Sequence, residues 1–165
     1  MRQRVFIGLF LVLTLILGAC ASGPKFSEMQ SSLPALAADQ GRIFFYRTAV
    51  LGAAVQPSVK LNGEVVGSAV PNGFFFVDRS PGDYTVSTTT EVERSAMLGV
   101  HAGETQYVRL NIGMGFLVGR VSPELVHPEI GAEEVSKLSY AGGPPKPPPT
   151  TMGPGAPGRL PETQK

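Results

Sequence analysis

The sequence is poor in the residues that build metal and disulfide sites. Its 165 residues include one cysteine, Cys20, and two histidines, His101 and His127. One cysteine excludes an internal disulfide, and a metal site needs three or four converging ligands, which two isolated histidines do not provide. The patterns Gly-x-Gly-x-x-Gly, Gly-x-x-x-x-Gly-Lys-Ser/Thr and Gly-x-Ser-x-Gly are missing as well. These absences predict a protein that is not an enzyme and that holds no metal or cofactor.

An excess of charge of one sign is also lacking. The chain has 14 basic and 13 acidic residues, and the loss of residues 1–19 would leave 12 basic residues against the same 13 acidic ones. Such a balance gives no electrostatic reason to expect nucleic acid as a partner. The remaining 146 residues have room for one domain.

No hydrophobic run in the sequence is long enough to span a membrane. Residues 5–17 are apolar apart from Gly8 and Thr14, whereas a spanning helix needs about 20 apolar residues. Arg2 and Arg4 precede this run, as in the positively charged start of a secretory signal peptide. We therefore predict a signal peptide over residues 1–19.

The run ends in Leu17-Gly18-Ala19-Cys20, which resembles the lipobox of bacterial lipoproteins. The resemblance implies cleavage between Ala19 and Cys20 and a lipid on the Cys20 thiol. Buried lipid contributes about 0.8 kcal/mol per methylene, so several chains hold a protein stably. Lipidation also caps a thiol that has no partner in this chain. Two alternatives remain open: an ordinary secretory signal that is cut at the same place, and an uncleaved short anchor.

The residues after the cysteine bear on location. Ala21 follows it, and the absence of aspartate there resembles the sorting pattern of outer-membrane lipoproteins in Gram-negative bacteria. This implies the bacterial cell envelope, at the outer membrane and facing the periplasm. Residues 20–40 are rich in small and polar residues, which predicts a tether between membrane and domain. Residues 27–38 have weak helical character.

Strand patterns dominate residues 41–141. Short β-branched and aromatic runs are bounded by Gly, Pro and Asn, and Asn62-Gly63 is typical of a tight type I′ hairpin. Because frequent turns separate seven or eight short runs, with no amphipathic helix between them, the pattern predicts an all-β fold, an antiparallel β-sandwich. We expect strands at residues 42–50, 58–61, 64–70, 74–77, 84–90, 97–100, 106–112 and 116–121, and a helical turn or two at 132–140.

The same pattern predicts a core. The apolar residues that we assign to it are Ile43, Phe45, Val59, Leu61, Val66, Phe74, Phe76, Tyr84, Val86, Leu98, Val100, Tyr107 and Leu110. Residues 44–46 and 74–76 are consecutive aromatic residues, so both faces of those strands carry rings. One face of a sandwich sheet is normally polar. Rings on both faces predict a second covered surface, buried by a helix or tail of the chain or by a partner.

The end of the sequence has a different composition. Eight of the 24 residues in 142–165 are proline. Such a segment cannot bury a core, and we expect it to be disordered or extended as polyproline II. It serves either as a solvated tail or as the ligand of a proline-recognising partner.

Several motifs together resemble a bacterial lipoprotein family whose domain has no known function. They are Gly41-Arg-Ile-Phe-Phe-Tyr-Arg47, Val59-Lys-Leu-Asn-Gly-Glu-Val-Val-Gly67, Asn72-Gly-Phe-Phe-Phe-Val-Asp78, Pro81-Gly-Asp-Tyr84 and Ala102-Gly-Glu-Thr-Gln-Tyr-Val108. This family is similar in pattern to the PEGA-type surface β-sandwich. The resemblance covers about residues 41–141 and implies a β-sandwich in the envelope; it implies no catalytic residues.

Four acidic residues are candidates for chemistry, and each has a structural interpretation. Asp78 and Asp83 flank a turn, where short acidic side chains cap the backbone. Glu91 and Glu93 stand beside an arginine, which predicts a solvated edge and not an acid–base pair, because closely spaced carboxylates need burial to shift their pKa values.

These patterns predict a lipid-anchored envelope lipoprotein that acts as a non-enzymatic interaction module, with the membrane and an envelope protein as partners. The alternative is a binding module for a small ligand or an envelope glycan, which would use Tyr46, Tyr84 or Tyr107 and nearby arginines. Arg109 and Arg120 have the charge to bind an anionic envelope group. An uncharacterised hydrolase is the third and weakest possibility.

Overall fold

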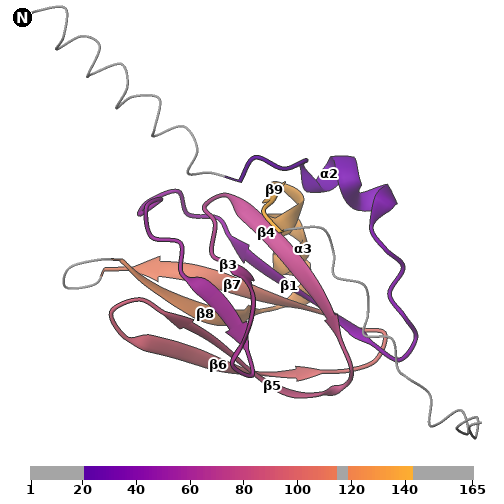
Figure 1. The fold of residues 1–165 in the computed structure, drawn as a ribbon. Helices are drawn as coiled ribbons and strands as arrows, with labels where there is room; N and C mark the ends of the chain where they lie inside the picture. The colour runs from indigo at the N-terminus through magenta and orange to yellow at the C-terminus, as the bar shows by residue number, and fades with distance from the viewer. Residues whose placement is uncertain (1–20, 115–118, 143–165) are drawn as a thin grey trace, which may run out of the picture.

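The computed structural model describes residues 21–114 and 119–142. Two β-sheets pack face to face, and helices cover the outer face of the first sheet (Figure 1). The elements are α2 (Phe26–Met29), the 3-10 turn η2 (Gln30–Ser32), β1 (Gly41–Arg47), β2 (Ser58–Leu61), β3 (Glu64–Ser68), β4 (Gly73–Arg79), β5 (Gly82–Thr89), β6 (Glu93–Val100), β7 (Thr105–Gly113), β8 (Arg120–Val126), α3 (Pro128–Ser136) and β9 (Ser139–Tyr140).

The predicted all-β sandwich is confirmed, and its first sheet is mixed. That sheet has the strand order β8-β7-β1-β4-β9, and the second has β3-β2-β5-β6. In the second sheet every pairing is antiparallel. In the first, β1 pairs with β7 in parallel and β4 pairs with β9 in parallel, while the pairs β1–β4 and β7–β8 are antiparallel. All seven residues of the central strand β1 are buried.

The hairpin that joins β2 and β3 has the predicted turn. Asn62 has φ 49° and Gly63 has φ 83°, as a two-residue type I′ turn requires. Apart from Gly63 itself and its two neighbours in the chain, no residue has an atom within 4 Å of where a Cβ on Gly63 would stand. The backbone conformation, and not a lack of space, therefore explains the glycine.

The sandwich core lies between the two sheets. The rings of Phe45 on β1 and Phe75 on β4 stack there at a centroid distance of 5.0 Å and an interplanar angle of 19°. The buried members of this core are Ile43, Phe45, Val59, Leu61, Ala69, Phe75, Val86, Leu98, Val100, Val108, Leu110 and Val121.

A second apolar cluster covers the outer face of the first sheet. Its buried members are Phe44, Tyr46, Phe74, Phe76, Val135 and Leu138, from β1, β4, α3 and the residues after α3. The predicted second covered surface is therefore present, and the chain itself covers it. Three residues that we assigned to the sandwich core, Phe74, Phe76 and Tyr107, lie in or against this cluster instead, and Phe75 takes their place between the sheets. Where rings occupy consecutive positions, the sequence does not tell which of them face the sandwich core, because a shift of one residue exchanges the two faces of a strand.

The C-terminal elements begin at other residues than the pattern predicts. The last long strand was expected at 116–121, and β8 is Arg120–Val126; residues 115–118 lie outside the described residues. Pro123 is compatible with a strand there because β8 is at the edge of its sheet. The expected helical turn near the C-terminus is present as α3, but it begins at Pro128, a favourable first helical position, and not at residue 132. The expected proline-rich tail falls on residues outside the structure from residue 143 onward.

Candidate membrane-anchoring site

The first described residue, Ala21, is fixed to the domain. Its amide N–H donates a hydrogen bond of 3.2 Å to the carbonyl oxygen of Pro71, in the connection between β3 and β4. The predicted signal peptide and the lipidation residue Cys20 lie outside the described residues. Since Cys20 is joined to Ala21 by one peptide bond, any group on Cys20 is attached next to this fixed point.

The residues after Ala21 extend the first sheet beyond β9. The Tyr140 N–H donates to the Pro24 carbonyl at 2.8 Å, and the Phe26 N–H donates to the Leu138 carbonyl at 3.0 Å. Lys25 forms an isolated antiparallel bridge with a residue of β9. These main-chain contacts hold the start of the described chain along the edge of the sheet.

Side chains of the same segment pack on the outer face of the first sheet. The ring of Phe26 meets Phe44 at 6.0 Å and Phe74 at 5.5 Å in edge-to-face geometry, and Met29 and Leu33 pack against the same cluster. Within the segment predicted as a tether, residues 21–33 therefore lie against the domain. The signal for this packing was the spacing of Phe26, Met29 and Leu33, three and four residues apart, as on one face of a helix.

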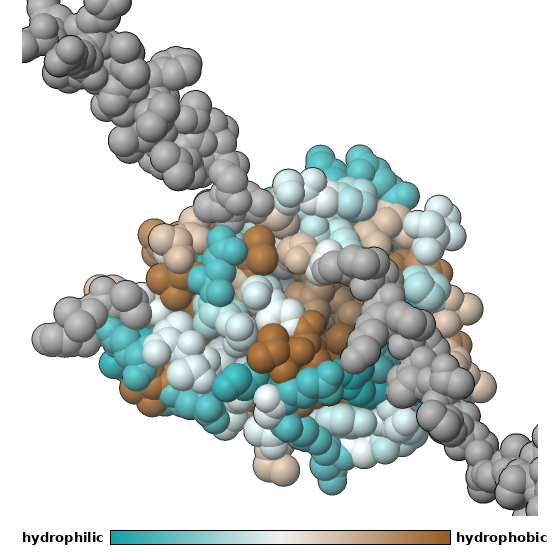
Figure 2. All heavy atoms as spheres, viewed as in Figure 1, coloured by the Kyte–Doolittle hydropathy of each residue, from teal (hydrophilic) through white to brown (hydrophobic). Residues whose placement is uncertain are grey.

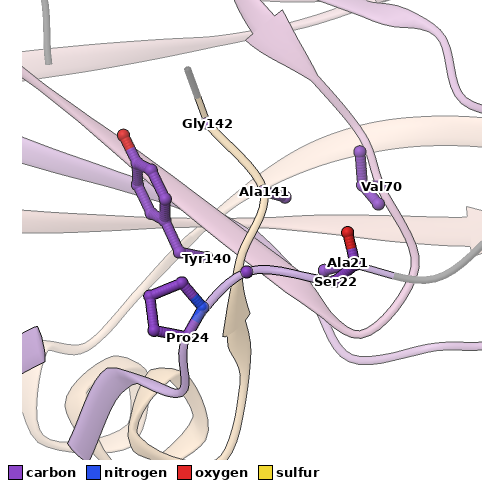
Figure 3. Close-up of a pocket in the computed structure, with 8 residues that line it drawn as sticks. Ala21, Ser22, Pro24, Val70, Tyr140, Ala141 and Gly142 are labelled. Atoms are coloured by element: carbon purple, nitrogen blue, oxygen red, sulfur yellow. The ribbon is translucent and has the colours of Figure 1, made fainter. Parts of the chain in front are cut away.

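An open hollow lies between this segment and the end of the described chain (Figure 3). Ala21 and Val70 approach each other on one side, and Tyr140 and Pro24 lie on the other. None of the residues that line the hollow is charged. Its lining is Ala21, Ser22, Gly23, Pro24, Val70, Tyr140, Ala141 and Gly142.

A buried arginine organises the neighbouring loop 48–57, which joins β1 and β2. Arg47 is the last residue of β1 and has no exposed surface. Burial lowers the pKa of its guanidinium below the ordinary value. All five of its N–H groups donate to main-chain carbonyls: Nε to Ala49 at 3.1 Å, Nη1 to Val55 at 2.7 Å and Ala69 at 3.0 Å, and Nη2 to Leu51 at 2.7 Å and Gly52 at 3.1 Å.

Loop 48–57 and Ala21 lie at the same end of the sandwich (Figure 1). The Ala69 carbonyl accepts from Arg47, and the Ala69 N–H donates to Pro57 at 2.9 Å. Two residues further on, Pro71 accepts from Ala21. The short connection from β3 to β4 thus contacts the loop on one side and Ala21 on the other. Sequence reasoning missed Arg47, because its partners are main-chain carbonyls, which every residue has, and no residue type in the sequence marks them.

A polar cluster fastens α3 to the first sheet. The hydroxyl of Tyr46 donates to Oε2 of Glu134 at 2.5 Å, and Nε of Arg109 donates to the same oxygen at 3.0 Å. Burial raises the pKa of Tyr46 to about 12; the hydrogen bond from Arg109 opposes this shift and the one to Glu134 adds to it. The Tyr46 side chain is inaccessible to solvent, so this cluster joins helix to sheet.

The three tyrosines predicted for a ligand site are not brought together. Tyr46 and Tyr107 lie on the helix-covered face, where the Tyr107 ring stacks on Phe44 at 5.3 Å. Tyr84 belongs to β5 in the other sheet, and its hydroxyl donates to the Ser80 carbonyl at 2.9 Å.

Charged candidates are engaged with other side chains of the protein. Arg120 Nε lies 3.4 Å from Oε2 of Glu91, which is in the turn before β6. Asp78 does not cap a turn as we expected: it accepts two hydrogen bonds from Arg42, at 2.7 and 2.8 Å. The antiparallel pairing of β1 and β4 places these two residues directly opposite each other.

The two histidines lie in separate exposed positions. His101 Nδ1 is 3.1 Å from Oε2 of Glu104 in a turn, and His127 precedes α3. Within the described residues, no three His, Cys, Asp or Glu side chains stand close enough to hold a metal ion. In residues 21–114 and 119–142, no helix is both long and apolar enough to cross a membrane.

Comparison with known proteins places the sandwich in a family. The family model described as "Protein of unknown function (DUF2846)" matches residues 37–122, from just before β1 into β8. An uncharacterized protein of Haemophilus influenzae is 26% identical over 132 residues, which cover 77% of this chain and 79% of that protein. No solved structure matches the chain.

Proposed function

Since this chain belongs to the DUF2846 family of proteins of unknown function, we propose a function from its own residues: a lipid-anchored lipoprotein of the bacterial envelope that acts as a non-enzymatic interaction module. The lipid is on Cys20, and the domain stands at the outer membrane, facing the periplasm. The two-sheet sandwich is compatible with such a surface domain, and the sequence motifs resemble those of PEGA-type surface β-sandwiches.

The observation that carries the proposal is the position of the only cysteine. Cys20 ends a lipobox-like sequence and is followed at once by Ala21, which is hydrogen-bonded to the domain. A lipid at this residue would hold the sandwich directly at the membrane surface. Several buried acyl chains give stable attachment, as a protein that works at one membrane needs.

The polar groups inside the domain support an architectural role for its core. Arg47 shapes a loop, Arg42 joins two strands through Asp78, and Glu134 fastens α3 through Tyr46 and Arg109. Interaction with a partner is then a task for the surface and for residues 142–165, whose proline content suits recognition in the extended polyproline II form.

Lipidation is tested with Cys20→Ser in the full chain. The variant should lose labelling by a fatty-acid analogue in cells and should accumulate as uncut precursor, because the thiol accepts the lipid before cleavage. The matched control adds Ser22→Cys to Cys20→Ser, which restores a thiol two residues away. Labelling should stay absent in the control if the lipobox sets the position. Labelling of Cys20→Ser itself would contradict the proposal.

The interaction role is tested by cross-linking the lipidated protein in intact envelopes. We expect one protein partner to be recovered in stoichiometric amount. The comparison variant ends at Ala141 and so lacks the proline-rich segment: loss of the partner assigns binding to that segment, and retention assigns it to the domain. Recovery of no protein, together with specific binding on a glycan array, would overturn the proposal in favour of a glycan-binding module.

A further inference from the structure

Loop 48–57 presents aliphatic side chains to solvent beside the anchor. Leu51 is 81% exposed, and Val50 next to it is also exposed. The end of β7 lies against this loop, since a Cβ on Gly52 would stand 2.4 Å from Ile112 Cδ1, and Met114 just beyond is 97% exposed. Figure 2 shows brown, hydrophobic residues at the surface over this part of the molecule. Contiguous exposed apolar surface marks a contact site.

Two connections at this end of the sandwich, loop 48–57 and residues 69–72, are free of charge, whereas the turn before β6 and the start of β8 at the same end hold the ion pair of Glu91 and Arg120. Residues 48–59 and 65–77 contain no Asp, Glu, Lys or Arg. We call loop 48–57, the connection 69–72 and Met114 the uncharged end. The turns 62–63, 79–82 and 101–104, which we call the charged end, connect the opposite ends of the strands and are flanked by or contain acidic and basic residues. A surface without charge can enter an apolar phase without losing the hydration of ions.

Arg47 fixes the conformation in which these side chains point outward. Its guanidinium draws five carbonyls of the loop and of Ala69 inward. Those carbonyls accept hydrogen bonds inside the protein. The loop therefore presents side chains to a binding partner and exposes few unpaired backbone acceptors. A surface that is already ordered loses less conformational entropy when it binds.

We propose that the uncharged end is a membrane-contacting surface, and that Val50, Leu51 and Met114 enter the lipid layer to which Cys20 is anchored. This inference rests on the proposed lipidation. Its geometric basis is that Ala21 is bonded to Pro71 at the same end. With no free spacer between the lipid and the domain, this end faces the bilayer and the charged end faces away from it. Aliphatic side chains that reach the acyl region add to the hold of the lipid anchor.

The test uses the fact that the chain contains no tryptophan. Leu51→Trp gives the full lipidated protein a sole tryptophan at the uncharged end, and Met97→Trp, at a residue 77% exposed on β6, is the matched control. Both proteins are reconstituted into vesicles of phosphatidylethanolamine and phosphatidylglycerol that carry brominated acyl chains. We expect most of the emission of Leu51→Trp to be quenched and that of Met97→Trp to be unchanged. Acrylamide in the aqueous phase should show the reverse order.

Fatty-acid labelling of both variants separates the two possible failures. If neither variant is labelled, the proposed lipidation fails and this inference fails with it. If both are labelled and floated with the vesicles, but Leu51→Trp is quenched no more than Met97→Trp, the membrane orientation alone is wrong. Protection of Leu51→Trp from acrylamide without quenching by brominated lipid would also overturn it, because a protein surface would then cover the loop.

Discussion

Strand β1 carries a buried arginine near each of its ends, and the two are satisfied in different ways. Arg42, near the charged end, forms a two-fold hydrogen-bonded pair with the carboxylate of Asp78, and Cζ of Arg42 lies 4.7 Å from the centre of the Phe76 ring. Arg47, at the uncharged end, donates to five main-chain carbonyls and leaves no N–H for a carboxylate.

The difference shows how one residue type serves two purposes. At the charged end a cation meets an anion whose side chain is 22% exposed, so water shares in the solvation of the pair. At the other end, carbonyl dipoles alone replace water around the cation, and the cation gives a charge-free loop its shape. The free energy that holds that loop is therefore concentrated in one side chain, because a buried charge that loses its partners is costly.

Replacement of Arg47 should have the largest effect. Arg47→Met leaves buried carbonyls without donors, each costing about 1–3 kcal/mol where water does not enter. After partial hydration of the loop we expect the free energy of unfolding to fall by about 4 kcal/mol, measured by urea denaturation of the mature protein. Arg79→Met, at the charged end, is the control and should cost less than about 1 kcal/mol, since Arg79 forms a long, part-exposed ion pair. Equal losses in the two variants would remove the contrast between the ends.

Replacement of Arg42 comes next. Arg42→Met should lower the free energy of unfolding by about 3 kcal/mol or somewhat less, because the abandoned Asp78 carboxylate can turn to water. A double-mutant cycle with Asp78→Asn measures the pair directly, and we expect a coupling energy of about 1–2 kcal/mol. A coupling near zero would mean that the Phe76 ring and the Pro34 carbonyl, which also accepts from Arg42, carry the contribution of Arg42.

The two arginines also show what the sequence could predict. Strand positions follow from aromatic and β-branched runs, and the Asn62-Gly63 turn follows from local backbone chemistry. The Arg42–Asp78 pair depends on which strands become neighbours, and the contacts of Arg47 depend on the path of a whole loop. Neither has a periodic signal. The sequence also could not show that Phe75, and not Phe74 or Phe76, faces the sandwich core, because all three are phenylalanines.

The candidate anchoring site also has one part that the sequence could predict and one part that it could not. The lipobox-like sequence before Ala21 is local and visible in the sequence, whereas the docking of residues 21–33 is a tertiary property. It needs the aromatic surface of Phe44 and Phe74 and the edge of β9 to be present first. Composition alone could indicate that residues 20–40 lie outside the sandwich but not that they lie against it.

The pH dependence of stability should report the buried hydroxyl of Tyr46, the residue that precedes Arg47 in β1. The pKa of Tyr46 is about 12 in the folded protein and near 10 in an unfolded chain. Between these values the unfolded state ionises while the folded state keeps its proton, so the free energy of unfolding falls as the pH rises from 10 to 12. The expected loss is on the order of 2 kcal/mol.

Tyr46→Phe is the variant that isolates this term. Burial also raises the pKa values of Tyr107 and Tyr140, so part of the alkaline loss should remain in Tyr46→Phe. The difference between the two proteins, followed by urea denaturation from pH 8 to 12, should grow smaller as the pH rises. A difference that is constant over this range would show that Tyr46 titrates normally in the folded state.

The smallest effect is expected at the charged end itself. Oε2 of Glu64 lies 3.7 Å from Nη2 of Arg79, and its side chain is 62% exposed. Such a pair is screened by water and salt, so Glu64→Gln should change the free energy of unfolding by no more than about 0.5 kcal/mol. The change should disappear in 1 M salt, where the screening length is about 3 Å. A loss comparable to that of Arg42→Met would mean that the exposed turns at this end, and not only the buried Arg42–Asp78 pair, stabilise it through charge.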